Sequence, residues 1–318
     1  MLIGLSLNAA ACNIPVFRYA LERWQPDTYE ITIFYDQLSA DQEKFVASLE
    51  AASIESNGIA NASIVRSKQN GEAAQSNSVD WKTIAQGKEL QLPYLIVQGR
   101  AGQGRAIVPW QGALNEARQL QVLDSPVRKE LVRRLQNSHS IVWLMLKSNV
   151  EQRNSETREL LKSQCDALST KIKLPDGIGL PGSELHSEVP LLIKFSFLEI
   201  DPDDRQEAFL VTLLKGIHPD AANQGEPLVA PVFGRGRALE VIPASELKAE
   251  LMEDLTLFLG GACSCQVKER NPGFDLLLST NWDRELFGES GTRPPPAKTV
   301  ADRDRAPVLL SIPPGRKK

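Results

Sequence analysis

The chain has 318 residues, 42% of them hydrophobic, and a net charge of −4 at pH 7. That length allows two soluble domains with packed cores, and the acidic balance argues against a nucleic-acid-binding protein, because such proteins carry a basic surplus. No apolar stretch reaches the roughly 20 residues that a transmembrane helix needs, so no transmembrane span is expected.

Residues 1–12 are similar to the second half of an export signal. A short apolar stretch is followed by small residues and then by Cys12, although no basic residue precedes the stretch. We therefore expect an exported protein of the periplasm or cell envelope, with Cys12 as a candidate site for a lipid anchor. The alternatives are a secretory signal without a lipid and an apolar segment that packs on the core. A cytoplasmic protein is expected if Met1 is the true start.

The first half of the chain predicts helices and strands in alternation. Apolar residues recur at helical spacing over residues 13–24, and residues 29–35 form a β-branched and aromatic run that is typical of a buried strand. A helix with a capping box, formed by Ser39 and Gln42, follows that strand. Residues 62–66 predict a second, short strand.

A hairpin closes this first half, and a basic helix follows it. Residues 93–110 contain two apolar runs separated by Gly102 and Gly104, which supply the positive φ of a tight reversal. Ser125 and Pro126 then predict the first turn of a helix. Its four cations lie largely away from its apolar stripe, and we interpret them as a solvent-exposed face rather than a site for an anionic partner: Arg128, Lys129, Arg133 and Arg134.

The same order of elements returns in the second half. A buried strand is predicted over residues 140–147, followed by a helix that carries Cys165 on its apolar stripe. An exposed connection rich in glycine and proline, residues 174–190, leads to a strand over residues 191–200. The acids of residues 201–204 are interpreted as a helix start, because no further metal ligands accompany them.

A second hairpin and a helix capped by Ser245 follow. The turn at residues 234–237 nearly repeats the turn at residues 102–105, which indicates a doubled unit. Arg105, Arg235 and Arg237 are therefore candidate contacts for an anion or a partner. A hairpin that simply needs glycine explains the same residues. After a compact tail, residues 288–318 are rich in proline and charge and predict disorder.

Strand, helix, strand, proline-led hairpin and closing helix thus occur twice, and this order resembles the thioredoxin fold. The resemblance implies an α/β protein with two thioredoxin-like units in tandem, each a mixed central sheet flanked by helices. In that family a cis proline starts the hairpin, which implies Pro93 in the first unit and Pro227 or Pro231 in the second. The expected organisation is a signal-like segment with a short helix, two thioredoxin-like domains and a disordered Pro-rich tail: residues 1–27, 28–137, 138–287 and 288–318.

The chain departs from that family at its catalytic position. Thioredoxins act through a Cys-x-x-Cys at the start of the first helix, where the helix dipole lowers the pKa of the thiol. The matching residues here, 36–39 and 149–152, contain no cysteine, which excludes dithiol chemistry at the usual site. Residues 12–24, 233–239 and 263–269 also resemble an uncharacterised family of exported bacterial proteins, which implies the compartment but no activity.

Cys263 and Cys265, in the second domain, form the sharpest local motif. Two thiols one residue apart can serve thiol–disulfide exchange or bind a soft metal such as copper(I) or zinc. A structural disulfide is the third interpretation, with Cys12 as one partner. Zinc is the weaker metal choice, because the three histidines are scattered along the chain.

The sequence therefore favours a non-catalytic, exported binding or assembly protein with a protein partner and no cofactor. The sequence contains neither a Ser/His/Asp order nor an H-E-x-x-H motif, so hydrolase chemistry has no support. The alternative is a thiol–disulfide oxidoreductase or a soft-metal-binding protein that acts through Cys263 and Cys265.

Overall fold

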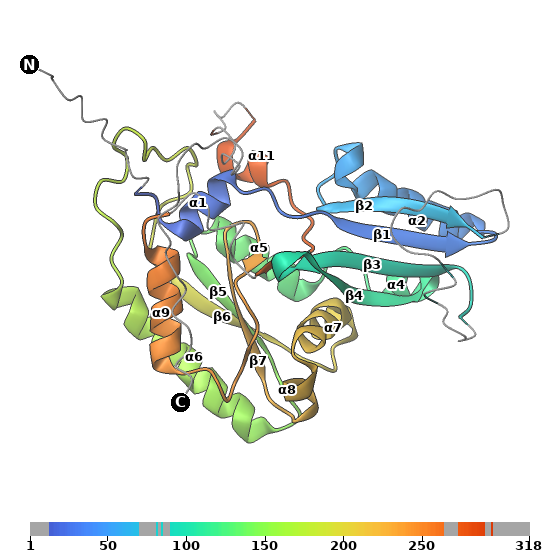
Figure 1. Cartoon of the computed structure of the whole chain (residues 1–318). Helices are drawn as coiled ribbons and strands as arrows, with labels where there is room; N and C mark the ends of the chain where they lie inside the picture. Colours follow the sequence, from blue (N-terminus) through green and yellow to red (C-terminus); the bar gives the residue numbers. More distant parts are fainter. Residues whose placement is uncertain are drawn as a thin grey trace, which may run out of the picture.

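The structure is a computed structural model that describes residues 13–69, 81, 84, 90–263, 273–289 and 294. Within them the protein is α/β, with two mixed sheets that are each flanked by helices (Figure 1). None of the helices in these ranges is long and apolar enough to cross a membrane. The signal-like residues 1–12 and most of the expected disordered tail, residues 288–318, lie outside the described part of the chain.

The first sheet has the strand order β2-β1-β3-β4. Strand β1 pairs in parallel with β2 and antiparallel with β3, and β3 forms a hairpin with β4. The two strands of the hairpin are joined by a single 3-10 turn, η2. The bounds of these elements are β1 (Tyr29–Tyr35), β2 (Ala62–Lys68), β3 (Tyr94–Ala101), η2 (Gly102–Gly104) and β4 (Arg105–Ala113).

Two helices cover one face of the first sheet. Helix α2 (Ala40–Ala52) begins at the predicted capping box, in which Ser39 Oγ accepts a hydrogen bond from the Gln42 amide and the Ser39 amide donates to Gln42 Oε1. Helix α4 (Leu114–Gln119), which the sequence did not predict, lies beside α2 and against the hairpin. The short helix η1 (Ile54–Ser56) connects α2 to β2.

The second sheet has the strand order β10-β8-β7-β5-β6, with β9 paired to β7. Its strands β6, β5, β7 and β8 repeat the order and the directions of β2, β1, β3 and β4. The bounds are β5 (Ile141–Leu146), β6 (Phe195–Ile200), β7 (Leu228–Phe233), β8 (Arg237–Ala238), β9 (Ile242–Pro243) and β10 (Phe274–Asp275). The predicted strand over residues 191–200 is thus shorter than expected.

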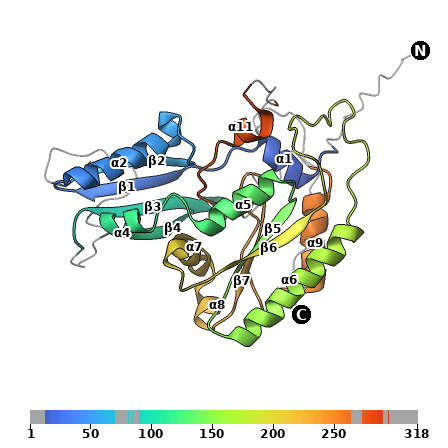
Figure 2. The same cartoon turned by 180° about the vertical axis from the view of Figure 1, so that it is seen from behind.

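Helices cover both faces of the second sheet (Figure 2). Alternate residues of β5 point to opposite faces, so Trp143 belongs to one core cluster and Leu144 to another. The Trp143 face packs against α1 (Val16–Arg23), α6 (Glu151–Lys171) and α9 (Ala249–Gly260). The Leu144 face packs against α5 (Pro126–Gln136), α7 (Ala208–Ile217) and α11 (Trp282–Phe287). The short helices η3 (Arg205–Glu207) and α8 (Pro219–Asn223) flank α7.

The two sheets share one hydrophobic core. Helix α7 packs against β4 of the first sheet and contributes to the same cluster as β5 and β7 of the second. The Phe209 ring meets the Tyr29 ring edge to face at 6.0 Å, and the Tyr29 hydroxyl donates to the Asp275 carbonyl at 2.7 Å. Helix α5 belongs to the first domain by sequence position, yet it lies against β5 and β6 of the second sheet.

Two local predictions differ from the structure. Helix α9 begins after Lys248 without a side-chain cap, and the Ser245 amide instead donates to Glu226 Oε2, so the predicted Ser245 cap is wrong. Helix α5 does begin at the Ser125 cap with Pro126 in its first turn. However, Arg128 of that helix is only 1% exposed, which contradicts its assignment to a solvent-exposed face.

Candidate functional site

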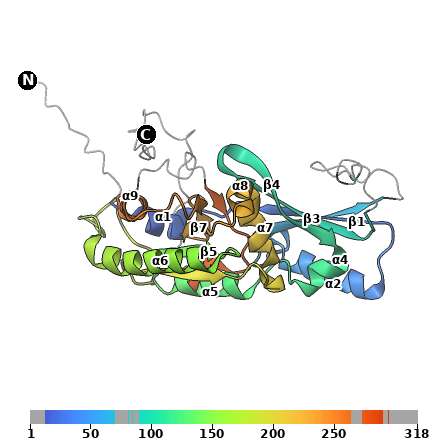
Figure 3. The same ribbon diagram turned by 90° about the horizontal axis from the view of Figure 1, so that it is seen from below.

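The turn of the first hairpin is open to solvent. Gly104 adopts a φ of 75°, and a Cβ built there would lie 4.0 Å from its nearest neighbour, Arg100 Nη1. Arg100 and Arg105 are both exposed. Figure 3 shows the β3–β4 hairpin standing out from the body beside α8. The hairpin therefore presents two cations to the surroundings, and Arg105 stays a candidate contact for a partner.

The turn of the second hairpin is buried beneath helix α1. Arg235 is 5% exposed, and its guanidinium donates to the carbonyls of Leu21 at 2.7 Å and Glu22 at 3.0 Å. It also pairs with Asp283 of α11 at 2.9 Å. A cation that binds the last carbonyls of a helix satisfies groups that lack helical partners and opposes the negative end of the helix dipole. Arg235 therefore fixes α1 and α11 to the second sheet.

Arg237 of the same turn is also held inside the protein. It is 5% exposed, pairs with Asp275 at 3.2 Å and donates to the Gly273 carbonyl at 3.1 Å. The segment around β10 therefore covers it. Arg235 and Arg237 both bind groups of this chain, so the interpretation of these two residues as contacts for an anion or a partner is corrected. Of the two turns, the first is the one with an arginine exposed to an outside partner.

Helix α1 also carries a buried ion pair that the sequence analysis missed. Arg18 Nε donates to Glu22 Oε1 at 2.8 Å, and both side chains are almost fully buried. The same guanidinium donates to the carbonyls of Ser187 and Val189, while the Glu22 carboxylate accepts from the amides of His186 and Ser187. Burial lowers the pKa of Arg18, and Glu22 opposes that shift. The i, i+4 spacing on a helix was the available signal, but exposed pairs have the same spacing.

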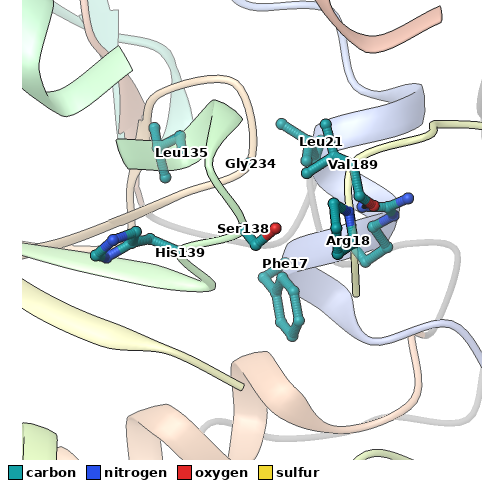
Figure 4. Close-up of a pocket in the computed structure, with 9 residues that line it drawn as sticks. Phe17, Arg18, Leu21, Leu135, Ser138, His139, Val189 and Gly234 are labelled. Carbon is teal, nitrogen blue, oxygen red and sulfur yellow. Dashed lines mark hydrogen bonds between the residues drawn. The ribbon is translucent and has the colours of Figure 1, made fainter. Parts of the chain in front are cut away.

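The cavity beside α1 is too small for a substrate. Figure 4 shows Phe17 and Arg18 of α1 on one side of it and Ser138 and His139 on the other. Its volume is about 10 Å³. That volume accommodates about one water molecule.

A second hollow of about 130 Å³ lies between α5 and the segment before α11, and Arg128, Lys129 and Arg133 are among its lining residues. Arg128 does not serve as a binding group there, because it donates to the carbonyls of Val122 and Leu277 and lies over the Phe209 ring. Burial lowers the pKa of Arg128 to about 10. The hollow therefore lacks a buried cation that faces an outside ligand.

The end of β1 lies beside a cis proline. The Leu92–Pro93 peptide bond is cis, as the resemblance implied, and the register of β1 with β3 places Phe34 opposite Tyr94. The Trp81 ring contacts both of these rings, with centroid distances of 5.2 Å to Phe34 and 5.8 Å to Tyr94. The bonds before Pro227 and Pro231 are not cis, so the expectation of a cis proline in the second unit is wrong.

The described cysteines are buried. Cys165 lies on the buried face of α6, where burial and the nearby Asp166 raise the pKa of its thiol to about 12. Cys263 is 5% exposed, and its amide donates to the Ile14 carbonyl at 2.9 Å. The part of the chain that the structure describes contains neither a disulfide nor a group of three metal ligands. Cys12 and Cys265 lie outside it, so the disulfide, redox and metal interpretations of Cys263 and Cys265 stay predictions.

Comparison with family models, curated proteins and solved structures finds no match to this chain.

Proposed function

We propose that this chain is a non-catalytic binding or assembly protein of the cell envelope, built from two thioredoxin-like units in tandem. The repeated strand order supports the two units, because each has a central parallel pair, an antiparallel hairpin and a helix after its first strand. The cis Leu92–Pro93 bond beside the end of β1 fits the same interpretation for the first unit.

The burial of Cys165 and Cys263, the cysteines among the described residues, supports a non-catalytic role. No cysteine stands at the starts of α2 and α6, where a thioredoxin holds its dithiol. Cys263 is 5% exposed, so a disulfide of another protein has little access to its sulfur in this conformation. Attack on a disulfide requires an accessible thiolate. An oxidoreductase that attacks through Cys263 would therefore need a movement that exposes this residue. Cys265, the other thiol of the pair, lies outside the described residues.

The observation that carries the proposal is the difference between the two hairpin turns. Both copies have the same glycine spacing, but the second is covered by α1 and the β10 segment, and the first is open. The open hairpin presents Arg100, Arg105 and the half-exposed Val108 on one projecting element. A protein partner with an acidic surface around an apolar contact would fit this hairpin.

Site-specific photo-crosslinking in the native host tests this proposal. We expect a crosslinker at position 105 to give a discrete protein adduct, and a crosslinker at Lys44, an exposed residue of α2, to give none. Replacing Arg100 and Arg105 together by Ala should lower adduct formation about tenfold when the crosslinker is at Val108. Equal adducts from positions 105 and 44 would contradict a partner site on the hairpin.

A second measurement separates the thiol alternatives from the binding role. Replacing Cys263 and Cys265 together by Ser should leave the hairpin adduct unchanged if the pair lies outside the contact. Loss of the adduct with retained folding would favour the alternatives. Mass mapping of the mature protein, with thiols alkylated before and after reduction, then shows whether Cys12 carries a lipid and which cysteines form a disulfide.

A further inference from the structure

A closed loop, residues 177–183, holds the point at which the N-terminal segment enters the fold. The Asn13 amide donates to Ser183 Oγ at 2.9 Å. A Cβ built on Gly177 would lie 2.8 Å from Asn13 Nδ2, so the Asn13 side chain packs directly on the loop. Figure 1 shows this yellow-green stretch between α6 and β6 beside the start of α1. Both ends of the loop therefore contact the residue that follows Cys12.

The loop carries apolar side chains toward solvent. Leu180 is 61% exposed, the largest exposure among the large hydrophobic side chains of the described residues, and Pro181 beside it is also exposed. The loop is closed on itself by three backbone hydrogen bonds, from the amides of Gly179, Leu180 and Ser183. Satisfied backbone groups lower the cost of entering an apolar medium, so such a loop can contact lipid without unfolding.

Residues 14–16 are fixed to the body of the protein, so no flexible segment separates Asn13 from the fold. Ile14 is fully buried, and the amides of Val16 and Cys263 bind the carbonyls of Gly261 and Ile14. Consecutive Cα atoms lie about 3.8 Å apart. A lipid attached at Cys12 would therefore hold loop 177–183 at the membrane surface rather than at the end of a flexible tether.

We propose that loop 177–183 is a membrane-contact loop that inserts Leu180 and Pro181 into the bilayer interface when the N-terminus is anchored. This inference rests on the proposed export and lipidation at Cys12. Two cations, Lys173 and Arg23, and two anions, Asp176 and Glu184, lie beside the loop, so these charges balance. The contact is therefore apolar, and it does not require anionic lipid.

Hydrogen exchange on vesicles tests the loop independently of native lipidation. The chain from Cys12 onward, with a hexahistidine tag directly before Cys12, is bound to phosphatidylcholine vesicles that contain a nickel-chelating lipid. We expect amides of residues 177–183 to exchange about threefold or more slowly on these vesicles than in solution. Leu180→Asp should abolish the slowing, and Ile54→Asp, at an exposed apolar residue between α2 and β2, should retain it. The same chain with its tag at the C-terminus should show less slowing.

Three outcomes overturn the proposal. One is unchanged exchange in the N-terminally tethered wild type, and another is a Leu180→Asp variant that is protected as well as the wild type. The third is slowing that grows with protein concentration without vesicles, because it assigns the loop to contact between copies of the chain. Mass analysis of the native protein separately decides lipidation at Cys12. An unmodified Cys12 with a protected loop would remove the anchor and leave the loop–lipid contact standing.

Discussion

Arg105 and Arg235 belong to two copies of one turn, and their surroundings predict different costs of substitution. Arg235→Leu removes two hydrogen bonds to carbonyls at the end of α1 and the ion pair with Asp283. We expect it to lower the free energy of unfolding by about 3 kcal/mol, because buried acceptors and a carboxylate lose their donor. Arg105→Leu changes an exposed side chain and should stay within about 0.5 kcal/mol of the wild type. Urea unfolding followed by tryptophan fluorescence gives both values, and equal losses would contradict the structural role of Arg235.

His139 should make stability depend on pH in the mildly acidic range. The pKa of its ring is lowered from 6.5 to about 4, chiefly by burial. The nearby cations Lys194, Arg134 and Arg133 contribute to this lowering of the pKa, and the Glu130 carboxylate opposes it. The Ser196 hydroxyl lies 2.8 Å from Nδ1. Below pH 6.5 the unfolded chain binds a proton that the folded ring still rejects, so stability falls as the pH drops toward 4.

Replacing His139 by Gln should flatten this part of the stability profile. Because the ring is only half-buried, we expect the loss of stability between neutral pH and about pH 4.5 to shrink by about 1–2 kcal/mol. Urea unfolding at the two pH values measures the change. An NMR titration of the ring with a midpoint at the ordinary value of 6.5 would contradict the argument.

Local sequence signals predicted the caps at Ser39 and Ser125 correctly and the cap at Ser245 wrongly, and they did not predict the burial of charges. The capping box of Ser39 and Gln42 and the Ser125 cap depend on residues within one turn, and the structure confirms both. The burial of Arg128 and Arg235 depends on segments more than a hundred residues away, such as Leu277 and Leu21. Glycine–arginine spacing identified the repeated turn, but spacing carries no information on what covers it.

Helix α1 is held against the second glycine turn, and the two turns again supply a matched test. Gly234 has a φ of 59°, and a Cβ there would lie 2.7 Å from Ala20 Cβ. Gly234→Ala must therefore displace α1 as well as strain the backbone, and we expect a cost of about 3 kcal/mol. Gly104→Ala strains the backbone at a φ of 75° with no atom closer than 4.0 Å, and should cost about 1 kcal/mol. Thermal or urea unfolding measures both costs, and a Gly234→Ala variant no weaker than Gly104→Ala would argue against close packing of α1.

Periodicity predicted most elements because each depends on its own residues. The β-branched run at residues 29–35 became β1, and the apolar run at 140–147 became β5. Which sheet a helix covers is a tertiary property, so the sequence placed α5 with the first unit although it lies against β5 and β6. The sequence identified both hairpin turns. It did not predict that α1 covers the second turn, because that contact joins residues more than 200 positions apart.

At the scale of the whole molecule, the segment before α11 ties the two sheets together. Asn61, next to β2, donates to the carbonyls of Asp27 and Leu276 and accepts from the Leu278 amide. Ala60 forms a β-bridge with Ser279. Together with α7, which packs on β4, these contacts make each unit part of the other's core. The two repeats of the strand order are therefore joined by one hydrophobic core.

We accordingly expect the protein to unfold in one transition, with far-UV circular dichroism and tryptophan fluorescence changing together. Cutting the chain after residue 137 would strip α5 from β5 and β6 and expose the Leu144 face of the second sheet. Fragments 28–137 and 138–287 should each lack the near-UV signal of packed aromatic rings, since each loses partners that bury its apolar surface. Co-expression of the two fragments should restore that signal. Two separate transitions in the intact chain, one of which matches an isolated fragment, would show instead that the units are independent domains.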